Sequence, residues 1–361
     1  MNDRIKTIFR WALPLCLLVF IVSCRYVPLL AETYARVVYP KLSAALSVFS
    51  SCVPFSLEEV LVVAVVGWMI VMPFCLKRKG RSWKLIFARE VEVLAWIYIW
   101  FYLGWGLNYF RYNIYTRMQV PPVRYEESEF LSFLDAYTDE LNAAWLPEAE
   151  TDMCTIDLEV KAFYHRLPDS CGLAKPKDYQ QIKFFTFTPL YSGVGVLGSM
   201  GPFFAEAQLN ADLLPVQLPF TYAHEYSHLL GVSNEAEANY WAYRACTEST
   251  SPTMRYSGYF GLFPYVLSNA SRLLGEEQLR EWLKRVRPEI KKEYNTNRQY
   301  WQERYSPFIG EVQEYAYNLF LKGNQIPSGQ KNYAEVIGIL LSLNSQKATA
   351  EAAATFSEST P

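Results

Sequence analysis

The stretch that decides the fold is PFTYAHEYSHLLG, residues 219–231. It contains no Gly or Pro between Phe220 and Leu230, and Pro219 suits the first turn of a helix. His224 and His228 are four residues apart, so on a helix their imidazoles lie on the same face, one turn from each other. The stretch therefore predicts a helix that presents two histidines side by side.

This pair has a chemical meaning because the chain holds only one other histidine, His165. Imidazoles one helical turn apart can share a tetrahedral Zn²⁺ ion. Glu225 follows His224 directly, so its carboxylate points about 100° around the helix. There it can accept a proton from a zinc-activated water without binding the metal itself. The spacing predicts a catalytic zinc centre with His224 and His228 as ligands and Glu225 as general base; two unrelated histidines on a helix are the alternative.

A catalytic zinc ion needs a third protein ligand and an open fourth position. Gly231 suits the end of the first helix, and Ser233 can cap a second one. We expect Glu235 to be the third ligand, with Glu237 as the alternative. Asn239 shares a helix face with Glu235 and is expected to hydrogen-bond one of the ligands. Negative charge is also favoured at any helix N-terminus, which explains one of these glutamates without a metal.

Three apolar segments occupy the first 110 residues, near 8–24, 60–76 and 93–110. Each approaches the roughly 17–25 residues that cross a bilayer, so we expect three transmembrane helices, with buried core helices as the alternative. Basic residues mark the cytoplasmic side, and they crowd the linker after the second segment: Lys77, Arg78, Lys79, Arg81, Lys84 and Arg89. This places the chain in the inner (cytoplasmic) membrane, with residues 111–345 outside the cytoplasm.

Two features lie around the first predicted span. Residues 21–24 read Ile-Val-Ser-Cys, which matches the end of a lipoprotein signal, so lipidation of Cys24 is an open alternative. Between the first two spans, apolar residues recur with a 3.6-residue rhythm from Leu30 to Phe49. This rhythm predicts a helix that lies along the membrane surface.

The outer domain reads as mainly helical. Helices are expected over 126–145 and 155–166, strands over 181–188 and 203–210, and a disordered tail over 346–361. Cys154 and Cys171 would lie outside the cytoplasm, where they could form a disulfide. The net charge of -2 provides no basic face, which excludes a nucleic-acid partner.

The motif resembles that of the gluzincin clan of zinc peptidases. Asn234 would complete a metzincin frame, but a neutral amide is a weak zinc ligand, which favours the glutamate class. Beyond the motif, the whole chain is similar to an uncharacterised bacterial family of membrane-anchored HExxH proteins. The similarity covers the three spans and residues 105–109, 202–210 with Glu206, 219–246, 256–259 and 333–336.

The resemblance implies a mainly α fold, with three N-terminal transmembrane helices and then a helical, zincin-like α+β domain with a small sheet. As in gluzincins, residues 203–210 would form an edge strand that pairs with a bound peptide, with an ordinary edge strand as the alternative. Tyr256, or alternatively Tyr259, would donate a hydrogen bond to the oxyanion. The expected function is hydrolysis of peptide or protein substrates at the extracytoplasmic face of the lipid bilayer. The alternative is a non-catalytic, zinc-stabilised envelope binding or sensor protein.

Overall fold

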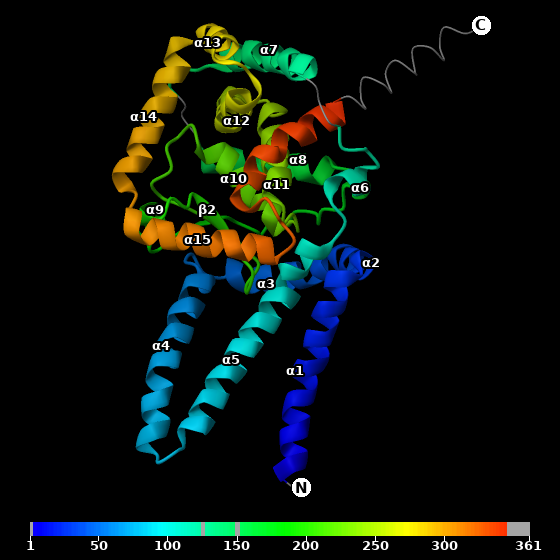
Figure 1. The fold of residues 1–361 in the computed structure, drawn as a ribbon, viewed down its shortest axis with the longest axis vertical. Helices are drawn as coiled ribbons and strands as arrows, with labels where there is room; N and C mark the ends of the chain where they lie inside the picture. Colours follow the sequence, from blue (N-terminus) through cyan, green and yellow to red (C-terminus); the bar gives the residue numbers. More distant parts are fainter. Residues whose placement is uncertain (1–2, 124–126, 149–151, 345–361) are drawn as a thin grey trace, which may run out of the picture.

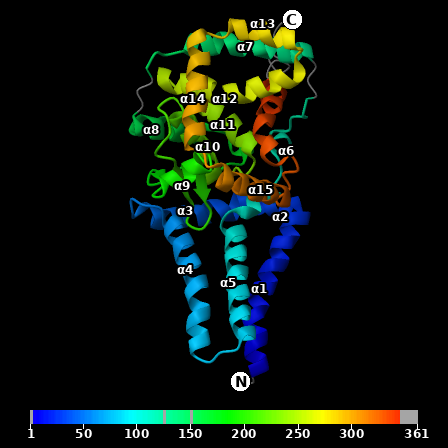
Figure 2. The ribbon, with the colours of Figure 1, turned by 60° about the vertical axis from the view of Figure 1, so that its left-hand side comes forward.

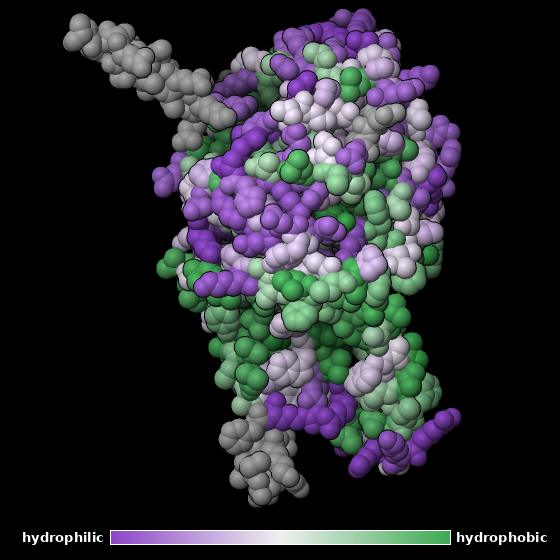
Figure 3. Space-filling model, turned by 180° about the vertical axis from the view of Figure 1, so that it is seen from behind, coloured by the Kyte–Doolittle hydropathy of each residue, from purple (hydrophilic) through white to green (hydrophobic). Residues whose placement is uncertain are grey.

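Three long helices extend from one side of a helical body in the computed structural model, which describes residues 3–123, 127–148 and 152–344. They are α1 (Asp3–Tyr26), α4 (Leu57–Arg78) and α5 (Trp83–Gly104). All three leave the body in the same direction (Figure 1), and a view turned by 60° shows the same arrangement (Figure 2). Hydrophobic residues gather over these helices, whereas the body is largely covered by hydrophilic ones (Figure 3).

Of the three predicted spans, α4 alone is a single helix that is long and apolar enough to cross a membrane, within the residues that the structure describes. The described part of α1 qualifies only together with the helices after it, from which it is bent by 106°. The third predicted span, 93–110, does not coincide with a single helix. α5 begins at Trp83, so it includes the charged residues Arg89, Glu90 and Glu92, and it ends at Gly104. Residues Gly106–Phe110 form a 3-10 helix, η2, inside the body.

A bent platform joins α1 to α4 at the base of the body (Figure 1). It consists of α2 (Pro28–Thr33), the π-helix η1 (Tyr34–Val38) and α3 (Tyr39–Ser51), so the helix predicted between Leu30 and Phe49 is present. On α3 the buried side chains include three serines, whereas Val48 and Phe49 are exposed. Polar groups therefore face the protein and apolar groups face outward, the reverse of the pattern of a water-exposed helix.

The body is built mainly from helices, with α10 (Leu218–Leu229) and α11 (Glu235–Thr247) at its centre, packed against α12 (Pro252–Leu273). Large aromatic side chains such as Trp241, Tyr226 and Phe263 are fully buried among them. The surrounding elements are α6 (Ile114–Met118), α7 (Glu127–Ala144), α8 (Met153–Arg166), η3 (Asp169–Cys171), α9 (Thr188–Gly193), α13 (Glu276–Arg285), α14 (Pro288–Arg304), α15 (Pro307–Gly323), η4 (Gly329–Glu335) and a helix over 336–344.

The sheet is small and has three strands in the order β1-β3-β2. β1 (Lys183–Phe184) pairs in parallel with β3 (Glu206–Leu209), and β2 (Gly198–Gly201) pairs with β3 in antiparallel fashion. β3 is therefore the central strand, so the prediction of an edge strand at 203–210 is wrong. β1 and β2 are the two edge strands of the sheet. The strand predicted over 181–188 is present only as the two residues of β1, because α9 starts at Thr188.

The start of α4 is joined to the sheet by the buried carboxylate of Glu206. It accepts hydrogen bonds from the Ser56 hydroxyl, the Glu58 backbone N–H and the Lys183 ammonium, each at 2.7 Å. A carboxylate with this many partners is a stable buried group. Glu206 is therefore an anchor between a long helix and the body.

The cysteines that the sequence singled out are free thiols. Cys154 is exposed near the start of α8, and Cys171 is buried in η3, beyond the far end of that helix. The disulfide that was predicted as possible is thus not formed. Cys24 is a free thiol that is fully buried within α1, and its lipidation stays a prediction.

Gly104 marks the place where α5 meets the body most closely. A Cβ at this position would lie 2.6 Å from the backbone oxygen of Pro202, whereas a Cβ at Gly67 of α4 would meet nothing within 4 Å. We expect Gly104→Ala to lower the free energy of unfolding by about 1–3 kcal/mol, as overpacking does. Thermal unfolding of the full-length protein in detergent measures this loss of stability, and Gly67→Ala is the matched control. Equal effects of the two substitutions would contradict the close contact.

Candidate metal centre

Three side chains meet at the centre of the body with their donor atoms almost equidistant. The Nε2 atoms of His224 and His228 are 3.1 Å apart. Glu235 Oε2 lies 3.2 Å from each of them. In the described part of the chain, these residues form the one cluster of three or more potential metal ligands. The spacing of HExxH thus predicted both histidines correctly as neighbours on one face of α10.

The triangle has the dimensions that a zinc ion requires. Ligand atoms about 2.0–2.1 Å from a tetrahedral zinc ion are about 3.3 Å from one another, close to the observed distances. The three protein donors would leave the fourth position of the tetrahedron open, as in catalytic rather than structural zinc sites. The residues present therefore fit a catalytic zinc ion.

The turn between α10 and α11 brings Glu235 to the histidines. Gly231 adopts a left-handed backbone with φ +98°, which allows the chain to reverse directly after the helix. The Nδ1 atom of His228 donates to the backbone oxygen of Val232 at 2.7 Å. A carbonyl can only accept, so this bond leaves the lone pair of His228 on Nε2, the atom that faces the centre.

The ligands are held by residues that the sequence did not single out for the site. Tyr317 of α15 donates to Glu235 Oε1 at 2.6 Å, so the two carboxylate oxygens have different partners. The indole N–H of Trp105 donates to the His228 carbonyl at 2.9 Å. The Tyr333 ring stacks on the His224 imidazole, with centroids 6.2 Å apart and planes 10° apart. Trp105 and Tyr333 lie in the segments that resemble the uncharacterised family, and this resemblance was the one sign in the sequence that they belong to the site.

Asn239 hydrogen-bonds a neighbour of a candidate ligand, whereas the sequence predicted a bond to a ligand itself. Its amide donates to the backbone oxygen of Tyr333 at 3.2 Å. It therefore supports the residue that stacks on His224 and does not bond a ligand itself. His165 lies in the last turn of α8 and is not part of the donor cluster.

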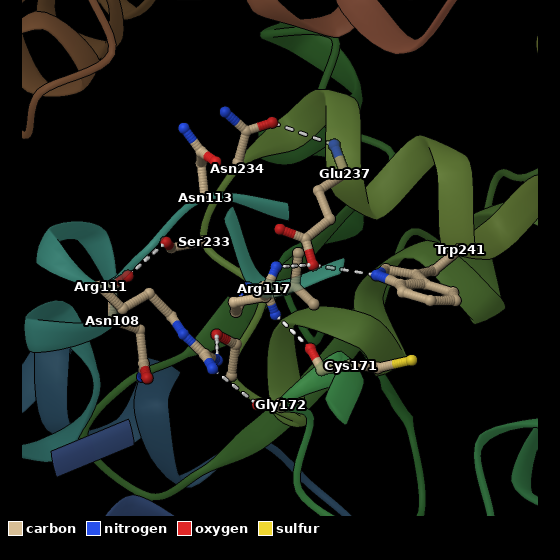
Figure 4. A network of polar contacts seen from close by, with 12 residues as sticks. Asn108, Arg111, Asn113, Arg117, Cys171, Gly172, Ser233, Asn234, Glu237 and Trp241 are labelled. Carbon is tan, nitrogen blue, oxygen red and sulfur yellow. Dashed lines mark hydrogen bonds and ion pairs between the residues drawn. The ribbon is translucent and has the colours of Figure 1, made fainter. Parts of the chain in front are cut away.

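Glu237, the alternative third ligand, points toward Arg117 and Trp241 (Figure 4). Its carboxylate forms a buried ion pair with Arg117 and accepts from the Trp241 indole at 2.9 Å. Asn234, the residue of the metzincin frame, caps α11 by accepting from the Glu237 backbone N–H. Both residues therefore have structural partners, which leaves Glu235 as the carboxylate at the centre.

Two arginines, Arg111 and Arg117, connect the segment after α5 to the region around the turn between α10 and α11 (Figure 4). Arg117 bonds the Cys171 carbonyl as well as Glu237. Arg111 donates to the Gly172 carbonyl at 2.8 Å and pairs with the buried Glu32 of α2. The platform, the segment after α5 and the metal turn are thus one hydrogen-bonded unit.

Glu225 lies on the sheet side of α10, against β2. A Cβ at Gly198 would lie 2.6–2.8 Å from its Cγ, Cδ and Oε1 atoms, so only glycine leaves room for this carboxylate. Burial raises the pKa of Glu225 above its usual value, although the two histidines oppose this shift. Glu225 is not a member of the donor triangle, which agrees with the prediction that it does not bind the metal.

The Glu235 carboxylate and the two histidines of the triangle shift the pKa values of one another. Burial disfavours a charged imidazole, but the Glu235 carboxylate outweighs this effect and raises the pKa of His228 to about 9. Burial also disfavours the Glu235 carboxylate, yet the two histidines hold its pKa well below the usual range. Glu235 therefore stays ionised, as a metal ligand must be.

The predicted oxyanion donors lie elsewhere. The Tyr256 hydroxyl donates to Glu293 at 2.6 Å, and the Tyr259 hydroxyl is 3.4 Å from Glu140. Both tyrosines belong to α12, in which Tyr256 packs against Phe260. The structure therefore does not bring Tyr256 or Tyr259 to the metal centre, and the tyrosines beside the triangle are Tyr317 and Tyr333.

One family model matches residues 34–341, and it is described as "Protein of unknown function (DUF3810)". The chain belongs to the DUF3810 family. Comparison with curated proteins and with solved structures gave no match. The matched range includes η1 and α3 of the platform, α4, α5 and every residue of the donor triangle. Since the description of the DUF3810 family states no activity, a function must be argued from the site.

The two glutamates of α11 should separate metal binding from stability. We expect Glu235→Gln to weaken zinc binding by more than about 100-fold, because loss of a direct ligand exceeds the 10–100-fold cost of losing its supporting partners. Glu237→Gln should keep one zinc ion per chain but lower stability by about 3–5 kcal/mol, because it leaves Arg117 buried without a counter-charge. Elemental analysis and thermal unfolding of both variants test this. Zinc loss from the Glu237 variant alone would contradict the ligand assignment.

Proposed function

We propose that the chain is a membrane-anchored zinc metallopeptidase that hydrolyses peptide bonds at the extracytoplasmic face. The observation that carries the proposal is the triangle of His224, His228 and Glu235, with its donors 3.1–3.2 Å apart and the Glu225 carboxylate one residue along the same helix. A bound Zn²⁺ ion would make a coordinated water acidic and polarise the scissile carbonyl.

The protein's own groups would then complete the reaction. Glu225 accepts the proton of the attacking water and afterwards delivers it to the leaving amine. Gly198 leaves this carboxylate the space to face the reacting atoms. Tyr333, whose ring stacks on the His224 imidazole, is a candidate donor to the developing oxyanion.

The substrate would lie along β2. This strand is at the edge of the sheet and contains Gly198, beside Glu225. An extended peptide can add to such an edge through backbone hydrogen bonds. β2 thus takes the role that the sequence had suggested for residues 203–210.

The membrane anchor would comprise α1, α4 and α5. Their far end holds the basic turn after Arg78, which belongs in the cytoplasm by the distribution of positive charge. The opposite end of α5 reaches the metal centre through Trp105. The site would therefore lie outside the cytoplasm and close to the membrane surface.

One observation favours a second function. His224, Glu225, His228 and Glu235 are each less than a tenth exposed. A buried metal site suits the alternative of a non-catalytic, zinc-stabilised envelope binding or sensor protein. The two functions differ in their requirement for Glu225, which only the peptidase needs.

Replacing the general base distinguishes them. We expect Glu225→Gln to retain zinc and to reduce kcat by about 10²–10⁴, since an amide cannot accept the proton. Zinc-loaded full-length protein can be assayed with a degenerate peptide library, with the new termini identified by mass spectrometry. Glu277→Gln on the exposed start of α13 is the control. Undiminished cleavage by the Glu225 variant would exclude this mechanism, and absence of cleavage by the unaltered protein favours the sensor.

A second prediction concerns the space beside the base. Gly198→Ala places a methyl group within 2.8 Å of the Glu225 carboxylate and must displace it. We expect about a 100-fold loss of kcat with the zinc content unchanged, because a displacement near 1 Å has this cost. Gly193→Ala is the matched control, because its Cβ would have no neighbour closer than 3.9 Å. Equal activities of the two variants would show that Gly198 does not position Glu225.

A further inference from the structure

Helix α15 carries an apolar stripe that is exposed in the described part of the chain. Phe308, Val312, Tyr315 and Leu319 follow one another at intervals of four, three and four residues, so they share one helix face. Their exposed fractions are 82%, 62%, 69% and 54%. Exposed apolar residues are common singly, but four large ones in a row indicate an interaction surface.

The opposite face of α15 is turned to the body. Gly310 and Leu321 are buried there, and Tyr317 donates to Glu235. At 100° per residue, Glu311, Glu314 and Lys322 fall on one flank between the two faces. The helix therefore has an inner face toward the metal centre, a charged flank and an outer face free of charge.

α15 lies at the same level of the molecule as the platform. In both ribbon views it runs across the base of the body, just above α3 and near the ends of α4 and α5 (Figures 1 and 2). Contacts confirm this position. Phe320 packs against Phe101 of α5, with ring centroids 5.7 Å apart. Just after α15, Asn324 accepts from the Tyr102 hydroxyl at 2.8 Å. The next residue, Gln325, donates to the Arg25 carbonyl of α1 at 3.0 Å.

We propose that α15 lies in the membrane interface, with lipid against its outer face. The inference rests on the membrane anchoring proposed above. The occupant is lipid, because α15 lies at the level of α3 and of the body end of α4 (Figures 1 and 2). Both of these helices expose apolar side chains, among them Val48 and Phe49 on α3 and Val60 on α4. An uncharged stripe beside a charged flank is the composition of helices that lie in the plane of the interface.

This placement links the bilayer to the metal centre through a single helix. Lipid holds the outer face of α15, while Tyr317 on the inner face holds Glu235 Oε1. α15 begins where Ser306 donates to the Gly193 carbonyl, next to the segment that leads into β2. The membrane surface thus fixes an element that covers the proposed site.

Photocrosslinking in a bilayer tests the proposal. The photoreactive residue p-benzoylphenylalanine is placed at Phe308 or Tyr315, where it replaces an aromatic side chain. Full-length protein is reconstituted in nanodiscs of phosphatidylethanolamine and phosphatidylglycerol, and adducts are identified by mass spectrometry. Glu314 on the charged flank is the matched control, and Val63 on α4 is the reference for lipid contact.

We expect lipid adducts at both aromatic positions at the level of Val63 and roughly tenfold above Glu314, as one-sided immersion of the helix requires. Crosslinked dimers would assign the face to a second copy of the chain and overturn the proposal. Adducts at Val63 without adducts at Phe308 and Tyr315 would also overturn it. Failure at Val63 as well would remove the anchoring on which it rests. Zinc and turnover do not enter the experiment, so its result is independent of the peptidase activity.

Discussion

The structure depends on the approach of one carboxylate oxygen to two imidazole nitrogens at 3.2 Å. Two buried histidines and a glutamate come this close only when the chain reverses within a few residues, which Gly231 permits through its positive φ. Without a metal ion, a proton on His228 balances the negative charge of Glu235, which raises the pKa of this histidine. A divalent ion would take the place of that proton. The tight turn between α10 and α11 is thus the feature around which the rest is arranged.

Much of the surrounding packing serves to hold this turn in place. Trp105 and Tyr39 bond the carbonyls of His228 and Leu229, the last turn of α10. Carbonyls in the last turn of a helix lack partners within the helix. The His228 carbonyl also accepts from the Gly231 backbone N–H at 3.0 Å, and the Tyr39 hydroxyl satisfies the Leu229 carbonyl. Trp105 and Tyr39 both come from the first 110 residues. The first 110 residues and the candidate metal centre are therefore not two modules joined by a linker.

The sequence predicted what depends on local spacing. The helix around His224, the reversal at Gly231 and the choice of Glu235 over Glu237 follow from helical periodicity and capping. It failed where partners are distant. Nothing local shows that Glu206 lies on a central strand, that Tyr256 bonds Glu293, or that Tyr317 reaches Glu235 across 82 positions. The sequence pattern also did not show that α5 begins at Trp83, before its charged residues. A run of apolar residues indicates which part of a helix can be buried, but not where the helix begins.

The buried indole of Trp105 has a practical consequence for work on this family. A truncation at residue 111 would remove the hydrogen-bond donors to the end of α10, together with Asn108, whose carbonyl receives the Ser233 hydroxyl beside the metal turn. The fragment would also expose the faces that α3 and α5 now cover. A soluble version of the outer region is therefore not equivalent to that region in the whole chain, and its failure to bind metal would say nothing about the intact protein.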